Sequence, residues 1–186
     1  MKITKVTEDA VATLLDDLLK RSPNNYTGYA DKVQAIIDDV RERGDEALFE
    51  MTKRFDGADL NADNIRVTQA EIDEAYTLVD ASLIEVIRKA MTNIRVYHEK
   101  QRQYGWFDTT PDGTILGQKV TPLQSTGVYV PGGKAAYPSS VLMNVIPAKV
   151  AGVEKIVMVT PPGKDGKVNP GTLVTANEAG VDEIYK

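Results

Sequence analysis

The sequence predicts an α/β fold: a helical N-terminal region followed by the start of a doubly wound, mostly parallel sheet with the order βαβαβ. Residues 126 to 162 contain, in unbroken order, the signals of a strand, a glycine turn, a helix and a second strand. Before residue 114 the chain instead carries long stretches of apolar residues at helical spacing. We therefore expect a boundary near residue 110, with helices in residues 1–110 and an incomplete α/β domain in residues 111–186.

The first strand of this unit is residues 126 to 130, which are mostly β-branched or aromatic and stop at Pro131-Gly132-Gly133. Such a run followed by glycines is typical of a strand that ends in a tight turn. Ser139 or Ser140 is expected to cap the next helix, because a serine hydroxyl accepts from the free N–H groups of a first turn. The helix is expected to be largely buried, since its sequence leaves little room for a polar face: Val141, Leu142, Val145, Ile146, Ala148 and Val150.

The second half of the unit is marked by a proline and a glycine. Pro147 lies inside the helix, where it removes a backbone hydrogen bond, and it predicts a bend near residues 143 to 147. Gly152 is expected to end the helix. Residues 155 to 160 form a short apolar run of the kind found inside a parallel sheet.

The last residues predict one more helix and a third strand. Asn169 with Pro170 is expected to cap and begin the helix, and Gly180 is expected to end it. Residues 182 to 186 then have the pattern of a new strand, and a domain rarely stops inside a sheet strand. We therefore expect the chain to be a truncated N-terminal part of a longer protein.

The glycine pair can serve a ligand or only the turn. The βαβ unit is the one with which α/β enzymes hold nucleotides, so residues 111–186 are expected to be Rossmann-like. Glycines let a ligand approach the backbone, and free N–H groups at a helix start favour a phosphate. However, GxGxxG is absent and residues 127 to 134 only approximate a Walker loop, so Gly132 and Gly133 can equally be a plain turn. Tyr129 is open in the same way: it can stack on a flat cofactor ring or pack at the end of a core strand.

The stretch GVYVPGGKAAYPSSVLMNVIPAKVAGV (residues 127–153) resembles the signature of the histidinol dehydrogenase family. The likeness continues in RERGDEALFEMTKRFDG (41–57), NIRVYHEKQ (93–101) and VTPPGKDGKVNP (159–170), so it covers most of the chain. The resemblance implies a zinc- and NAD-dependent enzyme that converts L-histidinol through the aldehyde to L-histidine. It further implies that Tyr129 contacts NAD, with Gly132 and Gly133 in the same cofactor cleft.

The same resemblance implies that the reacting groups lie outside this chain, because members of the family are more than twice as long. Their zinc ligands are a glutamine, an aspartate and two histidines, and a glutamate with a neighbouring histidine does the acid–base work, all in segments that would follow Lys186. Catalytic zinc usually takes three protein ligands with nitrogen, sulfur or carboxylate donors. Since the chain has no cysteine and one histidine, we expect neither a catalytic residue nor a metal ligand in it.

The single histidine, His98, follows an apolar helix face and lies at its edge. A histidine near a helix C-terminus usually makes a structural hydrogen bond or, when charged, interacts favourably with the helix dipole. We expect such a structural role for His98 and not a catalytic one.

The residues before 110 are expected to form charged helices, each with an apolar stripe that packs on its neighbours and a charged face in water. Their boundary signals are the periodic run of residues 7–21, the interruption at Gly44-Asp45, the end at Phe55-Asp56-Gly57, the capping box from Thr68 to Glu71, and a cap at Asp80 or Ser82.

A hairpin is expected between the two regions. Pro111-Asp112-Gly113 is a turn signal between two short extended stretches. Residues 115 to 120 are expected to join or edge the sheet, and Trp106 with Phe107 to seal the junction between helices and sheet.

Composition excludes several classes of protein. No uninterrupted apolar run approaches the roughly 18 residues of a membrane span, and the N-terminus lacks the apolar region of a signal peptide. With no cysteine available for disulfides, the cytoplasm is the expected location. The net charge of −5 and the lack of a basic cluster argue against nucleic-acid binding.

Three functional interpretations remain open at this stage. The parent protein is expected to be a histidinol dehydrogenase whose fragment is itself inactive, with a homodimer as the working form. Alternatively, the parent oxidises another amino or sulfonated alcohol, because the residues that contact substrate lie mostly beyond this chain. A third interpretation is that the chain is a non-catalytic module for dimerisation or weak nucleotide binding.

Overall fold

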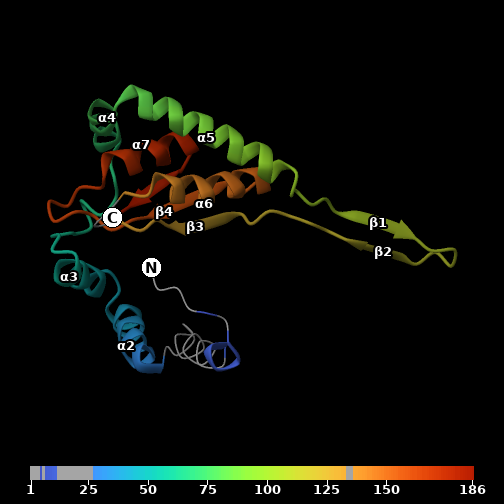
Figure 1. Cartoon of the computed structure of the whole chain (residues 1–186), viewed down its shortest axis with the longest axis horizontal. Helices are drawn as coiled ribbons and strands as arrows, with labels where there is room; N and C mark the ends of the chain where they lie inside the picture. The colour runs from blue at the N-terminus through green and yellow to red at the C-terminus, as the bar shows by residue number, and fades with distance from the viewer. Residues whose placement is uncertain (1–4, 6, 12–26, 133–135) are drawn as a thin grey trace. The chain divides into compact units, whose positions relative to one another are not determined.

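The computed structural model describes residues 5, 7–11, 27–132 and 136–186 of the chain. It divides into two compact units, one up to Ala47 and the other from Leu48 to Lys186. The first unit contains α2 (Thr27–Arg43) and the first residues of α3 (Asp45–Phe55) (Figure 1). Of the helix predicted over residues 7–21, residues 8–11 are helical, and the rest lies outside the described residues.

The predicted break between α2 and α3 is confirmed at Gly44. This glycine has a φ of +61°, in the left-handed region that favours glycine, and its N–H donates to the carbonyl of Val40 at 2.8 Å. The apolar stripe of α2 does not pack as predicted, because each of its members lies exposed in the described part of the chain: Val33, Ile36, Ile37 and Val40.

The second unit consists of a parallel sheet with two layers of helices on one face (Figure 1). Its strands have the spatial order β3-β4-β5, and the helices α6 and α7 connect them. Because such crossovers are right-handed, α6 and α7 pack side by side on the same face. Helices α4 and α5 pack in turn on α6 and α7, so residue 110 lies inside this unit. The bounds are α4 (Gln69–Leu78), α5 (Ala81–Glu99), β3 (Ser125–Tyr129), α6 (Pro138–Ala151), β4 (Lys155–Val159), α7 (Pro170–Ala179) and β5 (Glu183–Tyr185).

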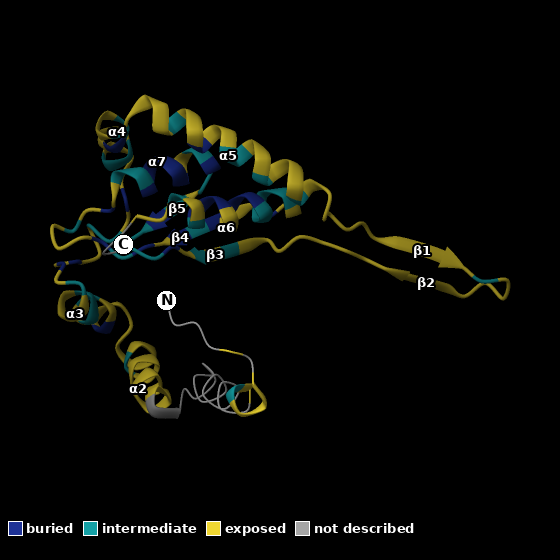
Figure 2. Cartoon of the chain, viewed as in Figure 1, coloured by how far each residue is buried: buried dark blue, intermediate teal, exposed yellow. Residues whose placement is uncertain are grey.

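The core lies between the sheet and α6 and α7. Alternate residues of β4 and β5 point toward the helices, and Ile156, Met158 and Ile184 are buried there (Figure 2). From the helix side, Val145 and Ile146 of α6 are fully buried. The predicted strands, the buried helix and the third strand are therefore confirmed.

The two edges of the sheet differ. At the β5 edge, residues 65 to 67 run antiparallel to the strand: the Val67 N–H donates to the carbonyl of Ile184, and the Lys186 N–H donates to the carbonyl of Ile65, both at 2.9 Å. The outer edge of β3 pairs with no strand in the described ranges.

Most helix ends lie where the sequence predicts them. Gly152 and Gly180 are left-handed residues that end α6 and α7. The other confirmed caps are the capping box of Thr68 with Glu71, Asp80 before α5, and Asn169 before α7.

The predicted serine cap of α6 is wrong. Tyr137 occupies the N-cap position without a side-chain hydrogen bond, and the helix already begins at Pro138. A proline is preorganised for the first helical position, so the helix starts there and includes Ser139 and Ser140 in its first turn. Pro147 lies within the continuous helix, and the bend at that point remains a prediction.

The predicted hairpin is present, with strands β1 (Trp106–Thr109) and β2 (Ile115–Gln118) joined by a turn in which Gly113 has a φ of +84°. The expectation that it joins or edges the main sheet is wrong, because among the described strands β1 and β2 pair only with each other. The expectation that Trp106 and Phe107 seal a junction is also wrong, since both side chains are exposed. The turn signal at Pro111-Asp112-Gly113 indicated the hairpin correctly but did not indicate what its side chains contact.

An ionic link joins the two helix layers. Arg88 of α5 binds Glu178 of α7 through Nε and Nη2 at 2.8 and 2.9 Å, and the Tyr76 hydroxyl of α4 donates to the same carboxylate at 2.8 Å. The guanidinium holds the pKa of Glu178 below its usual range, although burial opposes this. Three helices are therefore held together at one carboxylate.

Candidate functional site

A cleft of about 330 Å³ lies where β3 and β4 end. In open α/β sheets, ligands bind at the carboxyl ends of the strands, which is this edge. One wall is Gly132, and the other walls are the loop after β4 and the start of α7. The lining includes Thr160, Pro161, Asp165, Lys167, Asn169 and Thr172.

Gly132 is needed at this position for space. A Cβ atom there would lie 2.8 Å from the Pro161 carbonyl oxygen and 3.5 Å from Thr160 Oγ1. Thr160 is itself buried, and its N–H donates to the carbonyl of Tyr185 at 3.1 Å, so the backbone against Gly132 is held in place. Packing thus accounts for the glycine, while its backbone forms part of the cleft wall.

We expect Gly132→Ala to lower the free energy of unfolding by about 1 kcal/mol without any ligand, because overpacking against fixed backbone is destabilising. The matched control is Gly127→Ala in β3, where an added Cβ meets nothing within 4 Å. Urea unfolding followed by circular dichroism measures both. Equal stability of the two variants would contradict the packing argument for Gly132.

Tyr129 is the last residue of β3, and its side chain is 63% exposed. Its neighbours Val128 and Val130 point to the helix side, so the tyrosine ring lies on the opposite face of the sheet. In the described part of the chain the ring is therefore not packed in the core, and its contact with a cofactor ring stays a prediction. Val159, its partner in the β4 register, is exposed beside it.

The structure brings Tyr129 and Gly132 to the same edge of the sheet, but it does not bring them into one pocket. Tyr129 is absent from the described residues that line the cleft. Gly133, the third predicted cofactor residue, lies outside the described residues.

Sequence reasoning missed the loop that forms the far wall of the cleft. Lys167 Nζ lies 2.8 and 3.0 Å from the two carboxylate oxygens of Glu74, which raises the pKa of this lysine. The Lys167 N–H also donates to Asp165 Oδ1 at 3.1 Å. Glycines and charged residues directly after a strand, as in residues 161 to 168, were the available signal.

At the start of α7, a side chain already accepts a hydrogen bond from a backbone N–H group of the first turn. Asn169 Oδ1 accepts from the Thr172 N–H at 3.3 Å, so this end of the helix has its own side-chain cap. By contrast, α6 begins without such a cap, close to the glycine turn. The Ser140 N–H in the first turn of α6 donates to the Tyr137 carbonyl at 2.9 Å, so a side-chain cap is what distinguishes the start of α7 from that of α6.

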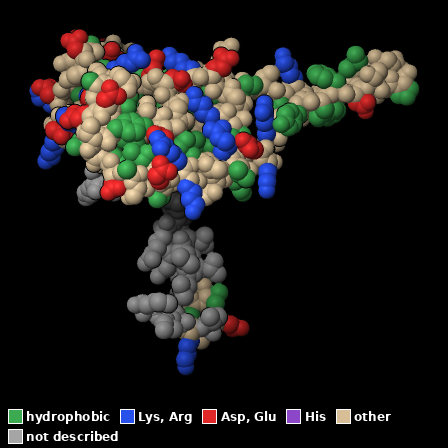
Figure 3. Space-filling model, turned by 90° about the horizontal axis from the view of Figure 1, so that it is seen from above, with side chains coloured by type: hydrophobic (Ala, Val, Ile, Leu, Met, Phe, Trp, Pro, Cys, Tyr) green, Lys and Arg blue, Asp and Glu red, His purple; other side chains and the backbone are tan. Residues whose placement is uncertain are grey.

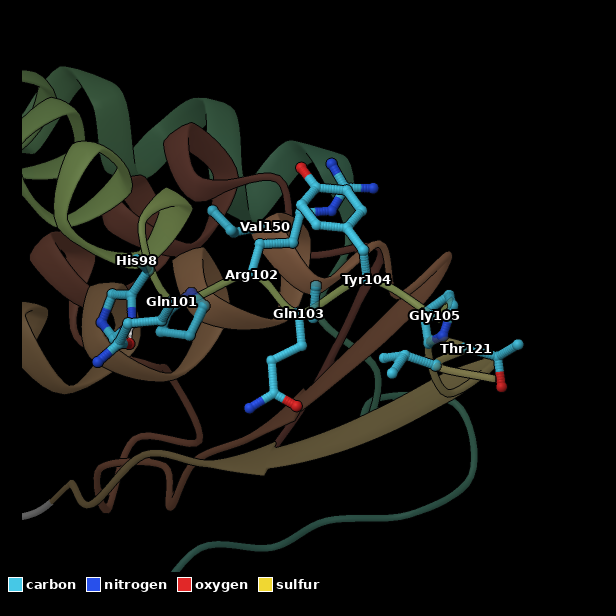
Figure 4. Close-up of a pocket in the computed structure, with 12 residues that line it drawn as sticks. His98, Gln101, Arg102, Gln103, Tyr104, Gly105, Thr121 and Val150 are labelled. Atoms are coloured by element: carbon cyan, nitrogen blue, oxygen red, sulfur yellow. Dashed lines mark hydrogen bonds between the residues drawn. The ribbon is translucent and has the colours of Figure 1, made fainter. Parts of the chain in front are cut away.

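A second cavity, of about 350 Å³, lies at the ends of α5 and α6 (Figure 4). It contains His98, whose Nδ1 lies 2.7 Å from Gln101 Oε1, and this contact confirms the predicted structural hydrogen bond. The Arg102 guanidinium lies 5.3 Å from the centre of the Tyr104 ring at the same cavity.

Among the described residues, no group of three or more histidine, cysteine, aspartate or glutamate residues is placed to hold a metal ion. None of the helices in this part of the chain combines the length and apolar character needed to cross a membrane.

Comparison with known proteins shows which family the chain is similar to. A family model described as histidinol dehydrogenase matches residues 19–186. The chain is 55% identical over 171 residues to histidinol dehydrogenase of Heliobacterium mobile, which covers 92% of this chain and 40% of that protein. It is 58% identical over 169 residues to histidinol dehydrogenase of Bacillus subtilis (strain 168), which covers 90% of this chain and 39% of that protein.

A solved structure agrees with this likeness. The crystal structure of histidinol dehydrogenase from Elizabethkingia anophelis matches with a TM-score of 0.79 and 38% sequence identity, over 85% of this chain and 36% of that chain. The present chain thus spans about two fifths of the length of the curated relatives it matches.

Proposed function

Because the chain belongs to the histidinol dehydrogenase family, we propose that the protein containing it oxidises L-histidinol through the aldehyde to L-histidine. The observation that carries this proposal is the identity of more than half of the aligned residues with proteins named histidinol dehydrogenase. The reaction would be the last part of histidine biosynthesis, with the cytoplasm as the proposed location.

NAD is the proposed hydride acceptor. NAD would accept one hydride in the oxidation of the alcohol, and a second NAD would accept another in the oxidation of the hydrated aldehyde. Tyr129 is proposed to contact the cofactor, since its flat ring is exposed at the carboxyl edge of the sheet, where ligands bind in such folds. Gly132 and Gly133 are proposed to lie in the same cofactor cleft, where small residues let the cofactor approach the backbone.

Zinc and the acid–base residues are proposed to come from the part of the relatives' length that this chain does not span. The composition of the chain supports this assignment, because one histidine and no cysteine leave few nitrogen or sulfur ligands. The 186-residue chain alone is therefore proposed to be inactive, and the working enzyme to be a homodimer.

The role of Tyr129 can be tested in the longer enzyme that contains this chain. We expect Tyr129→Ala to raise the KM for NAD about tenfold, because loss of a stacking ring costs about 1–3 kcal/mol, whereas Tyr129→Phe keeps the ring and should change the KM little. The control is Tyr97→Ala, since Tyr97 is also 63% exposed but lies on α5. An unchanged KM for NAD in Tyr129→Ala would remove this residue from the cofactor site.

The reaction itself is tested by following NADH formation with L-histidinol and zinc. We expect activity from the longer enzyme and none from the 186-residue chain. Turnover by the chain alone would show that it holds the reacting groups. A longer enzyme that oxidises another amino or sulfonated alcohol in preference to L-histidinol would correct the substrate.

A further inference from the structure

Two threonine side chains in the cleft beside Gly132 are buried without an internal hydrogen bond. Thr160 directly follows β4 and is 2% exposed, and Thr172 lies in the first turn of α7 and is 3% exposed. Neither hydroxyl bonds to another described residue, whereas the equally buried Thr175 hydroxyl donates to the Gly171 carbonyl at 2.6 Å. Buried hydroxyls normally have a partner, so these two require one from outside the described residues.

Both hydroxyls are reached from the cleft. Every enclosed side-chain nitrogen or oxygen atom of a buried residue in the described part of the chain has a hydrogen-bond partner. Since the hydroxyl oxygens of Thr160 and Thr172 have none, they are not enclosed, and the cleft is the space that both residues line. Thr160 Oγ1 also lies 3.5 Å from the position that a Cβ at Gly132 would occupy, so it faces the glycine wall. A ligand in the cleft therefore meets both hydroxyls.

The backbone holds both threonines in place. The Thr160 N–H donates to the Tyr185 carbonyl at 3.1 Å, and the Thr172 N–H donates to the carbonyl and to Oδ1 of Asn169 at 3.0 and 3.3 Å. A β-branched side chain is also stiff about χ1. The hydroxyls are therefore positioned before a ligand arrives, which lowers the entropy cost of binding.

The charges around the cleft favour an uncharged group over a phosphate. Lys167 is the single basic residue among the described residues of the lining, and both carboxylate oxygens of Glu74 already bind it. Asp165 lines the same cleft and repels an anion. On the face seen in Figure 3, basic and acidic side chains are interspersed, so that face has no uniformly basic field that would attract a phosphate.

The size and the place of the cleft fit the ribose end of a nucleotide. Its volume of about 330 Å³ is near the lower limit for small-molecule sites, which is room for one part of a dinucleotide. In doubly wound folds, a carboxylate of the nucleotide-binding half holds the ribose of the adenosine. Asp165 follows β4, and its Oδ1 accepts from the Lys167 N–H, while its Oδ2 forms no hydrogen bond with the described residues.

We propose that Thr160 and Thr172 bind the ribose hydroxyls of the adenosine half of NAD, with Asp165 at the rim of the cleft. This inference rests on the dehydrogenase proposed above and adds two cofactor-binding residues to it. A hydroxyl group both donates and accepts, so each threonine matches a ribose hydroxyl.

The test is equilibrium binding of adenosine and of 2′,3′-dideoxyadenosine to the longer enzyme, measured by ligand-observed NMR without L-histidinol. Thr160→Val and Thr172→Val keep the branched shape and remove the hydroxyl. Each should raise the Kd for adenosine about fivefold, because one net hydrogen bond changes an equilibrium constant by a factor of this size. The Kd for dideoxyadenosine, which lacks the ribose hydroxyls, should stay the same. Thr160→Ser retains the hydroxyl and should bind adenosine like the wild type.

The matched control is Thr175→Val, the same substitution at a buried position of α7. Its hydroxyl is already bonded to Gly171, so the variant should have a lower thermal midpoint and an unchanged Kd for adenosine. Thr160→Val and Thr172→Val remove no internal hydrogen bond, so their midpoints should not fall. Stability and binding are thus expected to change in different variants.

Each outcome decides a different part of the proposal. If the wild-type enzyme does not bind adenosine, or the valine variants bind it equally well, the role of the threonines is overturned, whereas the dehydrogenase stands on its separate assay. Equal weakening of adenosine and dideoxyadenosine, or weakening of nicotinamide mononucleotide in place of adenosine, would also overturn it. If adenosine binding depends on the hydroxyls but L-histidinol is not oxidised, the nucleoside site stands and the proposed reaction fails.

Discussion

Replacement of Ile156 by alanine is expected to lower the free energy of unfolding by about 3 kcal/mol. Ile156 lies in β4, the central strand, and its side chain is fully buried against the helix layer. The variant removes apolar contacts and leaves a cavity that the surrounding strands and helices fill only partly, so both terms reduce stability. Urea unfolding at constant pH measures the loss.

The matched control for this variant is Val159→Ala. Val159 is in the same strand but on the other face, where its side chain is exposed. We expect it to cost less than about 1 kcal/mol, because little buried area is lost. If both variants cost the same, the assignment of the core to the helix side of the sheet is wrong.

Glu178→Gln is expected to lower the free energy of unfolding by about 2 kcal/mol near neutral pH, because hydrogen bonds to charged groups contribute about 1.5–3 kcal/mol. The amide has one carbonyl oxygen in place of two charged ones, and the guanidinium of Arg88 then keeps only the more exposed Glu85 as its counter-charge. The control is Glu85→Gln, since Glu85 meets the same Arg88 at 3.0 Å but is much more exposed. That change should cost a few tenths of a kcal/mol.

The pH dependence of this effect has a definite sign. Because the pKa of Glu178 is lowered in the folded protein, its contribution is present above the unfolded glutamate pKa of about 4.3 and is lost as the pH falls through the folded value. The stability difference between wild type and Glu178→Gln should therefore shrink as the pH falls below about 4. Thermal unfolding at a series of pH values measures it, and a difference that grows in acid would contradict the assigned link.

Local signals predicted the strands and helices of the α/β part correctly. Gly152 and Gly180 end helices because left-handed residues close them, and Asn169 starts one because its side chain bonds the first turn. These signals involve neighbours in the sequence. The predicted serine cap was also a local signal, but it was wrong because the helix begins at Pro138, one residue before Ser139.

Contacts between distant residues were not predictable in this way. The bond between Arg88 and Glu178 joins residues 90 positions apart, and neither residue differs in type from the many surface charges around it. The turn signal of the hairpin predicted two paired strands, but the burial of their side chains depends on what lies next to each face. The prediction that the apolar stripe of α2 packs on its neighbours was wrong for the same reason.

The candidate site was predictable in part. The sequence predicted that a strand containing Tyr129 ends just before Gly132, and the structure confirms this end of the strand; the role of these residues in a cofactor site stays a prediction. The face on which the tyrosine lies depends on the strand register, and the Lys167–Glu74 pair at the cleft wall depends on how α4 packs beside the loop. Sequence alone contains neither fact.

The unequal edges of the sheet determine how it can be extended. Residues 65 to 67 occupy the hydrogen-bonding groups beside β5, so a further strand can pair only along β3. Any such strand would run directly beside Tyr129, and the tyrosine would change from an edge residue to one in the interior of a wider sheet. Growth of the sheet and completion of the site around Tyr129 would then be the same event.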